Sequence, residues 1–207
     1  MRRPPEMPPD DPATYRDGSA KGTVLPTIPY QCLMNTKSPE SNAPQWLILV
    51  GATFFIFVLG LSALWEADIR WLHFFQAWMY LATILWSFRR SRWGYFIGIS
   101  AAGLWDYTNV FATTFLCNGL ESLSKWIHTG HLERPDLLIA IPAWLSNFLV
   151  IVGCAWGYLR LREKSWSDVG QLVLTFALTT GFFALDMYLF QPRYLGIFPR
   201  LLHPRVP

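Results

Sequence analysis

The run WLILVGATFFIFVLGLSALW, residues 46–65, decides the fold of this chain. It contains no charged side chain and no proline. The hydrocarbon core of a bilayer is about 30 Å thick and an α-helix rises about 1.5 Å per residue, so about 20 apolar residues cross it. Lipid offers the backbone no hydrogen-bond partners, and a continuous apolar run of this length therefore crosses as a helix. The sequence predicts a protein embedded in a membrane.

Four further apolar windows follow the first, and aromatic residues lie near many of their ends, as is typical of membrane interfaces. They predict an all-α fold: a polytopic transmembrane helical bundle of about five spanning helices, filling residues 45–191. Between the third and fourth windows, apolar residues recur at helical spacing with polar residues opposite, which predicts a helix lying in the interface at about 119–129. The four windows are 71–88, 93–116, 137–159 and 171–190.

The two ends of the chain differ from this apolar middle. Residues 1–44 contain nine prolines and few large apolar side chains, so they are expected to form an extended or disordered tail without a core of its own. Residues 192–207 are expected to form a short C-terminal tail. The net charge of +3 is spread over the tails and loops, and no basic patch indicates nucleic acid.

The positive charges predict the orientation of the helices. If five helices alternate, one side of the membrane carries 11 Lys and Arg residues and the other carries 6. The short loops with Arg89 to Arg92 and Arg160 to Lys164 belong to the more positive side. Because positive loops stay in the cytoplasm, we expect a cytoplasmic N-terminus and a C-terminus on the opposite side.

A few polar side chains lie inside the apolar windows, where an unpartnered charge costs several kcal/mol. Asp106 and Asp186 fall at nearly equal depth if their helices start from the same side. Each could hold the packing together through hydrogen bonds with its neighbours, or could line a pocket. The candidate binding residues are Asp106, Asn109, Asp186, His73 and Asn147.

Two sequence features bear on helix packing. Gly94, Gly98 and Ala102 recur at every fourth position, which predicts a groove of small residues and a central place for the third helix. Pro142 lies inside the fourth window and removes a backbone donor, so a kink is expected between Leu138 and Pro142.

The sequence contains no motif that fixes a chemistry. There is no P-loop, GxGxxG or HExxH, and Cys32, Cys117 and Cys154 have no CxxC spacing. His128 and His131 lie three apart in a loop, where solvated side chains are the expected outcome. We therefore expect no metal site, no cofactor and no catalytic residue that could be named.

Three functions are compatible with these observations. The leading hypothesis is a non-catalytic subunit or accessory protein of a membrane complex, with the lipid bilayer and either a membrane-protein partner or a homo-oligomer as its contacts. The second is a small oligomeric transporter or channel that uses Asp106 and Asp186. The third is an intramembrane enzyme in which these two carboxyls act as acid and base near the outer leaflet.

Overall fold

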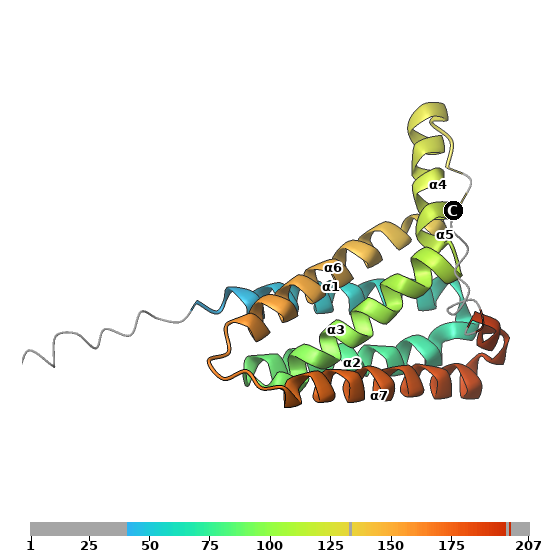
Figure 1. Cartoon of the computed structure of the whole chain (residues 1–207). Coiled ribbons are helices and arrows are strands. Elements are labelled where there is room, and N and C mark those ends of the chain that lie inside the picture. Colours follow the sequence, from blue (N-terminus) through green and yellow to red (C-terminus); the bar gives the residue numbers. More distant parts are fainter. Residues whose placement is uncertain (1–40, 133, 198, 200–207) are drawn as a thin grey trace, which may run out of the picture. The chain divides into compact units, whose positions relative to one another are not determined.

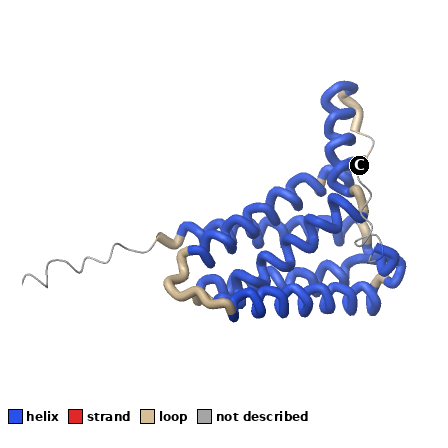
Figure 2. Tube along the Cα trace, in the orientation of Figure 1, coloured by secondary structure: helices blue, strands red, loops and turns tan. Residues whose placement is uncertain are grey.

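The computed structural model describes residues 41–132, 134–197 and 199, and these residues form helices joined by short loops and turns (Figure 2). No strand occurs among them, which confirms the predicted all-α class. Most of the predicted N-terminal tail (1–44) and the last part of the C-terminal tail fall outside the described residues. The helices are α1 (Ala43–Trp65), η2 (Ala67–Ile69), α2 (Arg70–Phe88), α3 (Arg92–Tyr107), η3 (Thr108–Ala112), α4 (Phe115–Thr129), α5 (Pro135–Leu138), α6 (Ala140–Leu159), α7 (Ser167–Phe190) and η4 (Pro192–Gly196).

Five of these helices run lengthwise beside one another (Figure 1). The central helix is α3, which packs against α2, α6 and α7, while α1 packs against α2 and α6. One end of this bundle holds the C-termini of α1, α3 and α7; we call it the cavity end. The other end holds the loop between α6 and α7, and we call it the Asp168 end.

Three helical segments of the described chain are long and apolar enough to cross a membrane: Ala43–Trp65, Pro135–Leu159 and Ser167–Phe190. The chain is therefore described as a multi-pass membrane protein. Two of the five predicted windows correspond to helices that do not meet this standard. The helix α3 has only 16 residues, and α2 begins with the polar residues Arg70, His73 and Gln76.

The predicted third helix, 93–116, was wrong in its second half. The α-helix ends at Tyr107, one π-helical turn follows in η3, and Thr114 has a φ of 55°. Threonine hydroxyls compete with helical hydrogen bonds, and the Thr113 hydroxyl accepts from the N–H of Phe115 at 3.3 Å. A new helix, α4, therefore starts at Phe115, four residues before the start predicted for the interfacial helix.

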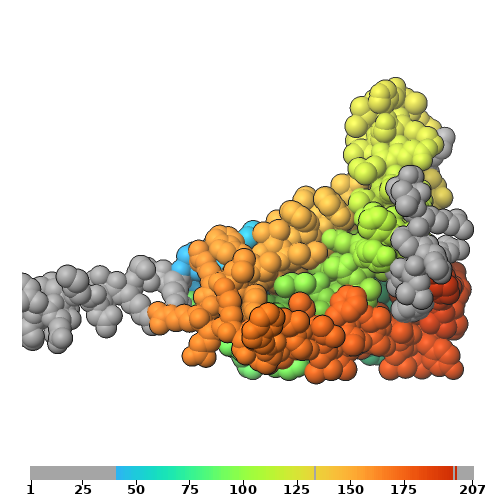
Figure 3. Space-filling view, in the orientation of Figure 1, coloured from blue at the N-terminus to red at the C-terminus, as the bar shows by residue number. Residues whose placement is uncertain are grey.

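The helix α4 leaves the bundle crosswise at the cavity end (Figures 1 and 3). Leu120 and Ile127 are exposed on one face of this helix, and Glu121 forms an ion pair with Lys125 at 2.8 Å on the other. The hydrogen bond from Lys125 lowers the pKa of Glu121, so this pair keeps its charges. An amphipathic helix lying across spanning helices is typical of the membrane interface.

Small residues let the central helix approach its neighbours closely. A Cβ atom at Gly98 would lie 2.5 Å from the Cys154 sulfur and 2.7 Å from a Thr83 methyl carbon. At Gly94 it would lie 2.6 Å from the backbone nitrogen of Ser87. The groove predicted from the spacing of small residues is therefore present, and it faces both α2 and α6.

Pro142 has the expected effect on the fourth window. A single turn, α5, ends at Leu138, and α6 begins at Ala140. Proline has no N–H to donate, and its ring crowds the carbonyl four residues earlier, which here belongs to Leu138. The helix is therefore interrupted at Ile139, inside the range predicted for a kink.

A buried ion pair joins α3 to α7 at the Asp168 end. Arg92 contacts Asp168 at 2.9 Å, and Asp168 is only 2% exposed. The other carboxylate oxygen accepts from the Tyr158 hydroxyl at 2.9 Å and from the Ser165 N–H at 3.0 Å. Both oxygens have partners, as a buried carboxylate requires.

Candidate functional site

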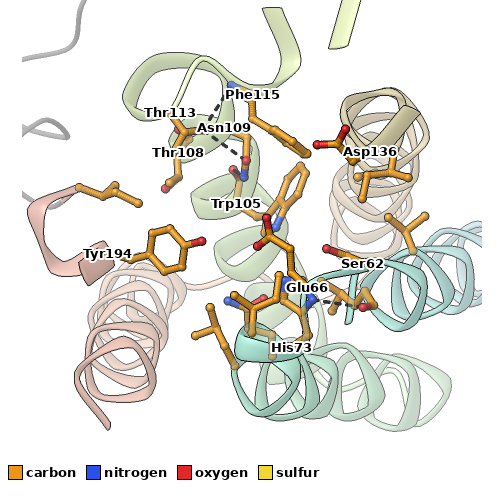
Figure 4. Close-up of a pocket in the computed structure, with 18 of the residues that line it drawn as sticks. Ser62, Glu66, His73, Trp105, Thr108, Asn109, Thr113, Phe115, Asp136 and Tyr194 are labelled. Carbon is orange, nitrogen blue, oxygen red and sulfur yellow. Dashed lines mark hydrogen bonds between the residues drawn. The ribbon is translucent and has the colours of Figure 1, made fainter. Parts of the chain in front are cut away.

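The cavity end contains a pocket of about 390 Å³ between the helices (Figure 4). Its wall combines residues from α1, α2, α3, α6 and α7 with the π-helical turn η3 and with η4. Apolar side chains such as Leu59, Leu104 and Phe183 form part of the wall, and polar side chains point in among them. A pocket of this size and composition is typical of sites that bind small molecules.

Glu66 and Tyr194 approach the pocket from opposite sides. Glu66 follows the last residue of α1, and its carboxylate points into the space beside Trp105 (Figure 4). Tyr194 lies in η4, and its hydroxyl points toward Glu66 (Figure 4). The Trp105 ring packs edge-on against the Phe55 ring, with ring centroids 5.0 Å apart. A carboxylate and two aromatic rings therefore face one space.

Two polar side chains of α2 lie deeper in the pocket wall. His73 contacts the Leu59 carbonyl oxygen through Nδ1 at 3.1 Å. A carbonyl can only accept, so Nδ1 carries the hydrogen, and Nε2 is the remaining polar atom of the ring. Gln76 is 6% exposed, and its buried side-chain oxygen has no hydrogen-bond partner among the described residues. A buried acceptor without a partner is uncommon in proteins.

The π-helical turn η3 positions the polar side chains of Thr108, Asn109 and Thr113. The Asn109 side-chain amide donates to the Trp105 carbonyl at 2.8 Å, and the Thr113 hydroxyl donates to the Asn109 side-chain oxygen at 3.4 Å. Thr108 also lines the pocket. A regular helix through this stretch would rotate these side chains relative to Trp105, and π-bulges of this kind are frequent at functional sites.

Arg134 and Asp136 lie at the rim of the pocket. The arginine donates two hydrogen bonds to the carboxylate, at 2.9 and 2.6 Å. This fork geometry fixes both groups, although the Arg134 side chain is 61% exposed. Glu66 is near enough to Arg134 to raise its pKa slightly further, after the larger effect of Asp136. The positive charge of the rim is therefore largely neutralised by Asp136.

Of the predicted site residues, His73 and Asn109 line the pocket. Asn147 does not; it is fully buried, and its side-chain oxygen accepts from the Tyr80 hydroxyl at 2.8 Å. Asp106 lies close enough to Tyr80 and Asn147 to act on both. These three residues form a buried polar cluster on the bundle side of the pocket.

Asp186 lies on the buried face of α7. It is 4% exposed, and neither carboxylate oxygen has a hydrogen-bond partner among the described residues. Thr175 and Thr179 are buried on the same face. The other predicted carboxyl, Asp106, lies near Asn147. The helices that carry the two carboxyls, α3 and α7, pack against each other.

Several pocket residues were not singled out by the sequence. Trp105 and Tyr194 resemble the many other aromatic residues of the chain, and Arg134 and Asp136 resemble ordinary loop charges. Only the break of the helix after Tyr107 brings the loop charges back over the end of α3. The pair of threonines at 113 and 114 is the one local signal for that break, and such pairs also occur inside regular helices.

Two further observations bear on the chemistry of the described residues. The described residues contain no group of three or more His, Cys, Asp or Glu side chains that could hold a metal ion. Cys117 and Cys154 are free thiols. The pocket provides two carboxylates, one of which is paired with Arg134, together with hydrogen-bonding side chains and aromatic rings.

Comparisons of the chain with protein-family models, with curated proteins and with solved structures found no match.

Proposed function

We propose that this chain is a non-catalytic, multi-pass membrane protein that binds an amphiphilic molecule in the pocket at its cavity end. The observation that carries this proposal is the pocket itself, whose apolar wall includes the buried and unpartnered Gln76 oxygen. An amphiphile would place apolar groups against Leu59 and Phe183, and polar groups near Glu66.

The packing beneath the pocket supports binding more than conduction. Phe55, Tyr80 and Asn147 are fully buried on the bundle side of the pocket, and the rings of Phe55 and Tyr80 lie 4.4 Å apart. A pore would need a wet path through these side chains. The pocket is therefore best interpreted as a site that a ligand enters from one end of the bundle.

A second part of the proposal is that α2 and α3 also cross the membrane, giving five spans. Exposed aromatic residues support this, because Trp46 and Trp65 mark the two ends of α1. Trp71 and Phe88 lie in the same way at the ends of α2. Aromatic residues prefer both interfaces of a bilayer. With the charge bias of the loops, five spans give a cytoplasmic N-terminus, and the cavity end faces the opposite side.

Labelling from outside the cell tests this topology. In a variant whose native cysteines are replaced by serine, Lys125→Cys should react with a membrane-impermeant maleimide and Lys164→Cys should not. Reaction of Lys164→Cys in intact cells would contradict the orientation. Equal reaction of both positions in sealed cells would contradict the odd number of spans.

Blocking the pocket tests the binding role. The chain is purified in a maltoside detergent with equal amounts of phosphatidylethanolamine and phosphatidylglycerol, and bound lipid is counted by native mass spectrometry. Ser62→Trp fills the pocket wall and should reduce bound lipid severalfold. Leu64→Trp is the matched control, because Leu64 lies on the same helix and is 74% exposed. Equal lipid binding by the two variants would contradict the proposal.

The role of accessory subunit in a membrane complex stays a prediction from the sequence. It is compatible with a ligand-binding pocket, since the Pro-rich N-terminal sequence offers a further segment for contact with a partner or a second copy of the chain. Gentle detergent extraction tests it: a monodisperse monomer that carries no other protein would contradict it.

The transporter alternative is favoured by one observation, the buried cluster of Asp106, Asn147 and Tyr80 next to the pocket. If this cluster carries an ion or proton, Asp106→Asn and Asp186→Asn should each abolish uptake while the fold is kept. The paired-aspartate enzyme stays a prediction from the sequence. A distance between the carboxyls of Asp106 and Asp186 too long for a substrate and a water to bridge would contradict it.

A further inference from the structure

The charges around the pocket leave one carboxylate without a counterion. Arg134 is held by Asp136 in a two-fold hydrogen bond. None of the ion pairs between described residues includes Glu66. The exposed Glu66 carboxylate points into the pocket (Figure 4). Among the charges that line the pocket and rim, one negative charge is therefore left over, which favours a cationic ligand.

Two tryptophan rings lie near the place where this cation would sit. Trp105 lies beside Glu66 in the close-up view, and Trp65, which also lines the pocket, precedes Glu66 in the chain (Figure 4). Tyr194 lies on the opposite side, where its ring already carries the Arg193 guanidinium at 5.0 Å. The face of an aromatic ring attracts cations, and the attraction is strongest for tryptophan. Tryptophan rings combined with a carboxylate therefore favour an organic ammonium group.

The His73 ring adds an acceptor to the pocket wall. It uses Nδ1 to donate to the Leu59 carbonyl, so a neutral ring presents Nε2 as a lone-pair acceptor. An ammonium group can donate an N–H to such an atom.

We infer that the pocket binds an organic ammonium group with Glu66 as its counterion, and that a membrane lipid carries this group. This inference rests on the proposed function. The lipid is favoured because the pocket lies at the end of the membrane-spanning helices, where head groups are, and because apolar side chains such as Leu59 and Phe183 form part of its wall. A phosphatidylethanolamine head group has the required charge and donors.

Competition between two lipids tests the inference. The protein in maltoside is given equal amounts of phosphatidylethanolamine and phosphatidylglycerol with identical acyl chains, and bound lipids are counted by native mass spectrometry. The wild-type chain should retain the ammonium lipid about tenfold better than the anionic lipid. In Glu66→Gln, which keeps the shape of the side chain, this preference should disappear.

Asp68→Asn is the matched control, since Asp68 is an exposed carboxylate two residues away that does not line the pocket. It should keep the preference of the wild type. A preference that survives Glu66→Gln, or that is lost equally in Asp68→Asn, would overturn the inference. The thermal unfolding temperature of each variant shows that the fold is kept.

Free ethanolamine distinguishes the source of the ammonium group. Displacement of bound phosphatidylethanolamine by millimolar ethanolamine in wild type but not in Glu66→Gln would support the ammonium site. Binding of ethanolamine at Glu66 by a wild-type chain that retains no phosphatidylethanolamine would overturn the assignment to a lipid. If both lipids bind equally and Ser62→Trp blocks both, the ammonium inference fails and the proposed binding function stands. If Ser62→Trp changes nothing, the proposed function fails as well.

Discussion

The two ends of this bundle use buried polar groups in opposite ways. At the Asp168 end, a carboxylate that is 2% exposed has Arg92, Tyr158 and a backbone N–H as partners. At the cavity end, Gln76 is buried with its oxygen unpartnered, and Glu66 faces open space. One end is closed by satisfied hydrogen bonds, while the other keeps unused hydrogen-bonding capacity. The Asp168 end therefore stabilises the bundle, whereas the cavity end is the candidate binding site.

The largest effect on stability is expected when the ion pair at the Asp168 end is broken, and the ion pair at the cavity end provides the comparison. Arg92→Ala leaves Asp168 without its counterion and should lower the free energy of unfolding more than the other variants. Arg134→Ala removes the exposed pair with Asp136 and should change this free energy little. Unfolding in detergent, followed by tryptophan fluorescence, measures both. If Arg134→Ala were as destabilising as Arg92→Ala, the contrast between the two ends would be lost.

A second pair of variants compares the packed and open faces of α3. Gly98→Ala places a methyl group against Cys154 and Thr83 and should cost about 2 kcal/mol. Gly103→Ala has no atom within 4 Å of the new methyl group and should be neutral or stabilising by up to about 1 kcal/mol. The same unfolding measurement applies. A destabilising Gly103→Ala would indicate that a partner covers this face.

A third pair removes one polar group from each environment. Tyr80→Phe deletes the hydroxyl that donates to Asn147 and should cost about 1 kcal/mol. Gln76→Leu deletes an acceptor without a partner and should raise stability by about 1 kcal/mol in lipid-free detergent. Adding phosphatidylethanolamine should stabilise the wild type more than Gln76→Leu. Destabilisation by Gln76→Leu in the absence of lipid would show that Gln76 already has a partner.

The smallest effect is expected at the corner between η3 and α4. Thr114 has a φ of 55°, where a β-branched residue is strained and glycine is not. Thr114→Gly should therefore stabilise the protein by about 0.5 kcal/mol, after the greater flexibility of glycine in the unfolded chain is deducted. Thr129→Gly, inside the last turn of α4, is the control and should be mildly destabilising.

Much of the fold could be predicted from the sequence, because hydrophobic length and small-residue spacing act locally. The window 46–65, the groove at Gly98 and the interruption near Pro142 all depend on neighbours within one or two turns. The pocket could not be predicted in the same way. It depends on the π-helical turn after Tyr107, which brings Asn109 and Thr113 to one wall.

The candidate site residues also show that local features can be predicted from the sequence and contacts between distant residues cannot. His73 and Asn109 were identified because a polar side chain inside an apolar window is costly wherever it lies. The sequence could not distinguish a buried polar group that has a hydrogen-bond partner, such as the Asn147 oxygen, from one without a partner among the described residues, such as the Gln76 oxygen. That distinction depends on which helices become neighbours, and residues far apart in the chain decide it.

The corner at Thr113 and Thr114 joins the binding pocket directly to the helix that leaves the bundle. Thr113 lines the pocket, and α4 starts two residues later with Phe115, which lines it too. Because the connection is so short, a displacement of α4 would also displace one wall of the pocket. The depth at which α4 lies in the bilayer would then affect the volume of the pocket.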